Sequence, residues 1–199
     1  DADMSVLVVQ VKLGFEQFRT WSNGDGGYYP PNASWYPLGD DALALDLGRF
    51  WVETGLTLEG LPNVVLRYEH RYREGEKSST HWGFTHPLGS SVPVRGLSPS
   101  FYDLDEKVDV FELDVDHTIK ATHFGAGVRY ETADLDNALK TTQWPGEAGL
   151  ELKSTDRQGT SYDLLNVNAF SETWIKQNLF FSTGFLFSDL DSSFSGSRI

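Results

Sequence analysis

Apolar and polar residues alternate with a period of two along most of this 199-residue chain, and this pattern constrains its fold more than any other feature. In the clearest segment, Phe50, Val52 and Leu56 alternate with Trp51 and Glu53. Successive side chains of a β-strand point to opposite faces of the sheet. The alternation therefore predicts strands with one apolar and one charged face, and no segment has convincing helical periodicity.

The alternation predicts an all-β, antiparallel, up-and-down sheet of about seven strands. Around Gly48 and Arg49 the apolar phase slips by one residue, which we interpret as a β-bulge within one long strand. The predicted strands lie near residues 5–19, 41–59, 64–74, 108–118, 124–133, 161–174 and 179–190.

The connections between these strands differ in length. Turns near residues 60, 121 and 177 are short, about four residues each. The other connections are long and rich in Gly, Pro, Ser and Asp, and they span residues 20–40, 75–107 and 134–160. Short and long connections alternate, so all short turns fall at one end of the sheet and all long loops at the other. Transmembrane β-barrels of bacterial outer membranes are built in this way.

Strand length points to the same class. The predicted strands have about ten to fifteen residues, whereas soluble strands commonly have about five or six. A tilted strand needs about 9–11 residues to cross the hydrocarbon layer. Closed single-chain bacterial barrels have an even number of strands. The odd count predicts that residues 1–199 form a single β-barrel domain fragment, a partial barrel with two open edges.

Composition excludes several classes of function. The net charge of −13 disfavours nucleic acid as a partner. The chain has no cysteine, so it has neither disulfides nor a thiolate metal site. Its five histidines lack metal-ligand spacing, and the acidic runs near residues 103–106, 134–136 and 189–191 do not fit a calcium-loop pattern. We predict no catalytic, cofactor-binding or metal-ligating residues.

If the apolar face meets lipid, the charged face lines a polar lumen. Cross-strand ion pairs, such as Glu53 with Arg71 and Asp114 with Arg129, are expected on that face. The predicted lumen-lining residues are Glu53, Arg67, Glu69, Arg71, Arg73, Glu112, Asp114, Asp116, Arg129 and Glu131.

Residues 66–80 (LRYEHRYREGEKSST) and residues 105–117 resemble strands that join the extracellular loops of large bacterial barrels. The general sequence pattern of about two thirds of the chain is similar to that of the porin-like MtrB/PioB-type barrels, which partner multihaem cytochromes in extracellular electron transfer. This resemblance implies a bacterial outer-membrane location, the lipid bilayer as a partner, and a periplasmic or lumenal cytochrome partner. It assigns no functional residue.

The leading expectation is a channel or conduit, without enzymatic activity, that passes small solutes or sheathes a partner protein. A soluble β-sandwich or barrel that acts as a binding module is the main alternative. A barrel-embedded hydrolase is a third hypothesis, in which His81, His86, Asp103 and Asp105 would converge in the longest loop.

Overall fold

The computed structural model describes residues 2–6, 9–22, 27–28, 35–36, 43–87, 89–145, 147, 149–176 and 178–199. Within these residues the protein is all-β, and every strand pairing is antiparallel. None of them belongs to a helix that is long and apolar enough to span a membrane. The predicted fold class, an antiparallel up-and-down sheet, is confirmed.

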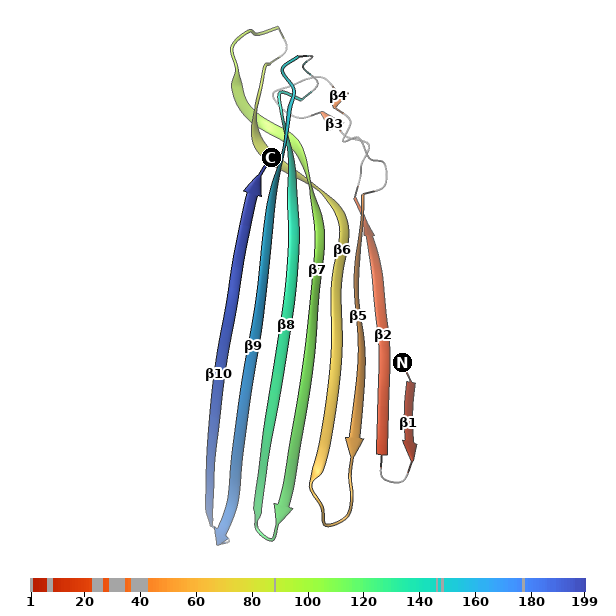
Figure 1. Cartoon of the computed structure of the whole chain (residues 1–199), viewed down its shortest axis with the longest axis vertical. Helices are drawn as coiled ribbons and strands as arrows, with labels where there is room; N and C mark the ends of the chain where they lie inside the picture. The colour runs from red at the N-terminus through yellow and green to blue at the C-terminus, as the bar shows by residue number, and fades with distance from the viewer. Residues whose placement is uncertain are drawn as a thin grey trace.

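In the described part of the chain, eight strands form one open sheet in the order β1-β2-β5-β6-β7-β8-β9-β10, with β1 and β10 at its edges. Figure 1 shows them side by side, with short turns at the lower end. A separate two-stranded sheet pairs β3 with β4. The strands are β1 (Ala2–Val6), β2 (Val9–Trp21), β3 (Gly27–Tyr28), β4 (Trp35–Tyr36), β5 (Ala44–Leu56), β6 (Asn63–Thr85), β7 (Val94–Ile119), β8 (Thr122–Gln143), β9 (Leu152–Lys176) and β10 (Leu179–Arg198).

Three predictions about the elements were wrong. The segment near residues 5–19 is a hairpin of β1 and β2 instead of one strand. The predicted loops 75–107 and 134–160 are mostly strand, because β6 continues to Thr85, β7 begins at Val94, β8 continues to Gln143 and β9 begins at Leu152. Of the predicted loop 20–40, residues 23–26, 29–34 and 37–40 lie outside the described residues.

The predicted β-bulge at Gly48 and Arg49 is also absent. The register of β5 runs without a shift against both β2 and β6. Residues that pair across antiparallel strands share a face. Leu47 therefore lies on the same face as Glu53, and Phe50 lies on the opposite face. The slip in the sequence marks a change in which face of the strand is apolar.

The two faces of the sheet can be assigned from the register. The face that holds Phe50 and Phe111 is called the apolar face, and the face that holds Glu53 and Arg67 is called the charged face. In its lower part, the apolar face carries a continuous belt across the strands from β2 to β10, called the apolar band. The apolar band comprises Val9, Val11, Leu13, Phe15, Phe50, Val52, Leu56, Val64, Leu66, Tyr68, Phe111, Leu113, Val115, Ile119, Phe124, Ala126, Val128, Tyr130, Leu165, Val167, Ala169, Phe181, Phe185 and Phe187.

Above the apolar band the polarity of the faces is exchanged. On β7, Asp103 and Asp105 occupy the apolar face, and Leu104 occupies the charged face. On β8, Asp136 likewise occupies the apolar face, and Leu135 occupies the charged face. The same exchange occurs on β5, where Leu45 and Leu47 lie on the charged face together with Glu53. The upper parts of the long strands are therefore polar on the side where the lower parts are apolar.

Burial shows which way the sheet curves. Leu104, Val110 and Ala133 are 4–5% exposed, and all three lie on the charged face. Leu66 and Phe111 of the apolar band are 58% and 48% exposed. Side chains converge inside a curved sheet and diverge outside it. The sheet therefore curves around its charged face.

Candidate functional site

The register brings all ten predicted lumen-lining residues to the charged face. Five residues of alternating sign stand directly opposite one another across β2, β5, β6, β7 and β8, and we call them the charge ladder. Like charges directly opposite would destabilise the sheet, whereas opposite charges attract. The charge ladder consists of Lys12, Glu53, Arg67, Glu112 and Arg129.

The charge ladder corrects the two ion pairs expected from the sequence. Glu53 stands opposite Arg67 and not Arg71, and Arg129 stands opposite Glu112 and not Asp114. The Lys12 ammonium lies 2.9 Å from a carboxylate oxygen of Glu53, and Nε of Arg129 donates to Glu112 over 2.9 Å. Both partners lie across a hairpin, and they follow when the register is counted outward from the turns near residues 60 and 121.

Glu131 is the most buried carboxylate of the charged face, at 7% exposure. It accepts hydrogen bonds from the Tyr162 hydroxyl (2.6 Å), from the Arg71 guanidinium (3.2 Å) and from Arg129. Burial of a carboxylate is costly unless hydrogen bonds and opposite charges compensate for it. Three donors from β6, β8 and β9 therefore make Glu131 the centre of the ion-pair network.

Most remaining charges of this face are also paired. Arg67 donates to Glu69 over 2.6 Å on the same strand. Glu106 accepts from Arg73 (2.6 Å) and from Asn137 (2.8 Å). A side-chain amide, that of Asn63, donates to Asp116 over 3.2 Å. The charged face is thus a largely self-neutralised polar surface that can contact water or a hydrated solute.

A row of polar groups bounds the apolar band from above. The hydroxyl of Tyr68 donates to Asp109 over 2.7 Å, and that of Tyr130 donates to Asp163 over 2.8 Å. Nδ1 of His70 lies 2.8 Å from the same oxygen of Asp109. Tyrosine combines an apolar ring with a polar tip, which suits the boundary between an apolar and an aqueous environment.

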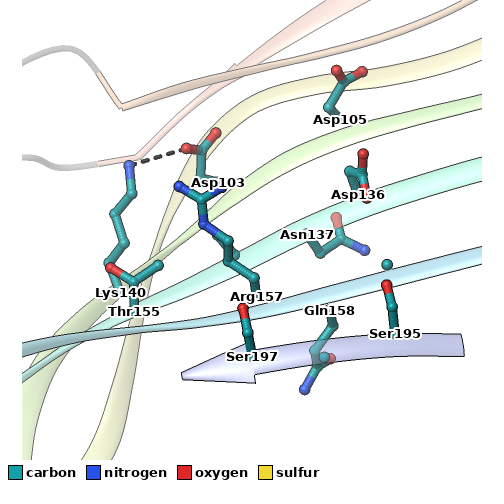
Figure 2. A pocket seen from close by; sticks show the side chains of 13 residues that line it. Asp103, Asp105, Asp136, Asn137, Lys140, Thr155, Arg157, Gln158, Ser195 and Ser197 are labelled. Carbon is teal, nitrogen blue, oxygen red and sulfur yellow. Dashed lines mark ion pairs between the residues drawn. The ribbon is translucent and has the colours of Figure 1, made fainter. Parts of the chain in front are cut away.

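A hollow of about 660 Å³ lies above this row, between the upper parts of β7, β8, β9 and β10 (Figure 2). We call it the polar groove. Asp103, Asp105, Asp136, Lys140 and Arg157 supply its charged groups. By register, all five belong to the apolar face, above the apolar band. The groove and the charge ladder therefore lie on opposite sides of the sheet.

The residues of the hydrolase hypothesis do not converge. Asp103 and Asp105 line the polar groove, whereas His81 stands opposite Ser98 on the other face. His86 is held by Glu147, which accepts from the backbone amide of His86 (2.8 Å) and lies 2.6 Å from its Nδ1. Among the described residues, no group of histidines and carboxylates could hold a metal ion.

Sequence reasoning missed Tyr162, Asn137 and Arg157. Tyr162 shares a face with Glu131 only because of the register between β8 and β9. Asn137 and Arg157 lie in segments that were predicted as loop, so their faces were not considered. Asp136 belongs to an acidic run that the sequence analysis had considered for calcium. Comparison with known proteins finds no match, whether among protein-family models, curated proteins or solved structures.

Proposed function

We propose that this chain is part of the wall of an outer-membrane β-barrel that acts as a channel or conduit. In the proposal, the apolar band meets lipid and the charged face lines the lumen. The observation that carries it is the exchange of polarity between the faces. Below the exchange, hydrocarbon lies outside the wall; above it, water does. A soluble β-sandwich has the same two environments along its whole length, so its strands have no reason to exchange their apolar side.

The dimensions of the apolar band support this proposal. On β7 the apolar-face residues from Phe111 to Ile119 are apolar except for His117. This stretch is about nine residues, and a tilted strand crosses the hydrocarbon layer with about 9–11. The strands β6 to β10 then continue upward by about ten residues or more, which would place a rigid wall above the membrane in place of flexible loops.

The apolar band is also slanted across the strands, as tilted strands require. Its uppermost residue is Phe15 on β2 and Phe187 on β10. The successive strand pairings connect Phe15 on β2 with Asp191 on β10, so these two residues stand at the same height on the sheet. Phe187 lies four residues below Asp191. At about 3.4 Å per residue and about 4.8 Å per strand, the slope corresponds to a tilt of roughly 25°. Barrel strands are tilted in the same manner, by about 35–45°.

The paired charges of the charged face suit the passage of small hydrated solutes. They equally suit a partner protein in the lumen, such as a multihaem cytochrome, whose surface groups would contact a polar and self-neutralised wall. Neither role requires a catalytic group.

A spin-label experiment tests the membrane assignment. The chain has no native cysteine, so Val128→Cys and Asn168→Cys each provide a single labelling site. Val128 lies in the apolar band, and Asn168 lies on the charged face. In lipid vesicles, a nitroxide at residue 128 should collide with oxygen and avoid a water-soluble nickel chelate, while a nitroxide at residue 168 should show the reverse. A label at residue 128 that both reagents fail to reach would indicate a protein core and overturn the proposal.

A further inference from the structure

The polar groove lies where a membrane protein would face the headgroups of the lipids around it. Asp105 stands on the apolar face, and it precedes Phe111 of the apolar band by six residues along β7. This separation is about 20 Å along the strand. If the apolar band spans the hydrocarbon layer, the groove opens toward the outer-leaflet saccharides, outside the barrel. A solute that crosses the lumen would not pass it.

Two charged side chains of the groove lack a partner. Within the described part of the chain, Arg157 and Asp136 form no ion pair and no side-chain hydrogen bond. The other charges are occupied: Asp103 lies 3.0 Å from Lys140, and Asp105 lies 2.9 Å from Lys107. Figure 2 shows Arg157, Asp103 and Asp136 among the side chains that line the groove. The groove therefore contains one guanidinium group and one carboxylate that are both available to a ligand.

The floor between these two charges is open and polar. Gly159 stands opposite both Asp136 and Ser195. A Cβ at Gly159 would lie 2.7 Å from the Ser195 hydroxyl and 3.0 Å from a carboxylate oxygen of Asp136. The missing side chain therefore leaves room for a ligand to approach the serine and the aspartate. No aromatic ring lines the groove, so the ligand would be held by its polar edges.

We propose that the polar groove binds an acidic saccharide of outer-leaflet lipopolysaccharide. The fork of donors on an arginine matches the oxygens of a carboxylate or phosphate, so Arg157 would bind the acidic group. The carboxylate of Asp136 accepts hydrogen bonds only, and sugar hydroxyls are abundant donors. A simple anion would satisfy Arg157 but would be repelled by Asp136, which selects for hydroxyl groups beside the acid. This inference rests on the proposed membrane location.

The test measures the binding of lipopolysaccharide to the protein in mild detergent by native mass spectrometry. Two preparations are compared: one with a complete acidic core saccharide, and one truncated to the lipid anchor. Arg157→Gln should bind the complete form at least about tenfold more weakly, because a hydrogen bond to a charged group is lost. Arg157→Lys, which keeps the charge but loses the fork of donors, should bind more weakly than the wild-type protein and more tightly than Arg157→Gln. Lys153→Gln is the matched control, since Lys153 lies on the same strand and face but outside the groove.

Three results would overturn the inference. Unchanged binding by Arg157→Gln would exclude Arg157 as the anchor. Equal binding of the complete and truncated forms by the wild-type protein would show that the saccharide is not recognised. Binding of the free core oligosaccharide as tightly as the whole lipid would indicate a soluble saccharide as the source. The spin-label experiment distinguishes these failures from a failure of the proposed function, because it reports membrane insertion independently of saccharide binding.

Discussion

Replacing Glu131 with Gln removes one charge from the charged face and keeps the shape of the side chain. The carboxylate is 7% exposed and accepts hydrogen bonds from Tyr162, Arg71 and Arg129. The amide oxygen of Gln can take the place that faces the two arginines, and the Tyr162 hydroxyl can reorient to accept from the amide nitrogen. The substitution therefore keeps the hydrogen bonds but removes the negative charge that faces the two arginines.

The expected loss follows from these two arginine bonds. Both guanidinium groups stay charged, so the bonds remain charge-assisted and lose only the attraction between opposite charges, which is roughly 1 kcal/mol for a partly buried pair. Two bonds weakened by about 1 kcal/mol each give a loss of about 2 kcal/mol in the free energy of unfolding. Arg129 keeps Glu112 at 2.9 Å, while Arg71 keeps only Glu69 at 3.6 Å. The remaining partners limit the loss to this range.

Glu53→Gln is the matched control, since it also removes a carboxylate charge from the charged face. Its ion pair with Lys12 is more exposed, with 27% and 45% of the two side chains accessible. Exposed pairs of this kind contribute about 1 kcal/mol or less. Urea unfolding in lipid vesicles, followed by tryptophan fluorescence, measures both variants. If Glu53→Gln costs as much as Glu131→Gln, burial and the number of donors do not determine the strength of this network.

Three further predictions concern other parts of the sheet. Val128→Arg should reduce the free energy of unfolding in lipid by about 2–4 kcal/mol, while Asn168→Arg on the charged face should cost much less. Gly48→Ala should cost about 1–3 kcal/mol in the same assay, because a Cβ there would overlap the tyrosine ring that covers Gly48. Burial raises the pKa of Glu147, but the bonds from His86 outweigh it and hold the pKa below its ordinary value. This contact therefore stabilises the strand tips at neutral pH and is lost as the pH falls below the ordinary range of glutamate. Glu147→Gln should remove that part of the acid titration of tryptophan fluorescence.

The common face of the ten predicted lumen-lining residues could be deduced from the sequence. The period of side chains in a strand is two, so residues such as Arg67, Glu69 and Arg71 must share a face once they belong to one strand. The same rule fails for the upper parts of the strands if the apolar residues are assumed to stay on one face along the whole strand. On that assumption the upper segments were predicted to be loops. In those segments the apolar residues, such as Leu104 and Leu135, have moved to the opposite face. The alternation continues there, but with the phase reversed.

The slip at Gly48 and Arg49 is one sign of this reversal in the sequence. From the sequence it has two explanations, an extra residue in the strand or a change in the surroundings of the strand. Only the unbroken register against β2 and β6 distinguishes them. On β7 the same reversal falls between Val110, which shares a face with Leu104, and Phe111, so the apolar phase slips by one residue there as well.

The sequence by itself determined the all-β class, the order of the main hairpins and the common face of the ten predicted lumen-lining residues, because these depend on local periodicity. The tertiary structure decided which charges face one another across the long connections, such as those between β6 and β7 and between β8 and β9. A shift of two residues between neighbouring strands preserves every face and changes every partner, so Arg67 could have met Asp114 instead of Glu112. Glu131 with its three donors, and the groove that places Arg157 near Asp136, arise from the register of four separate strands. The local sequence does not determine the register across the long connections, because that register depends on the sum of pairings over the whole sheet.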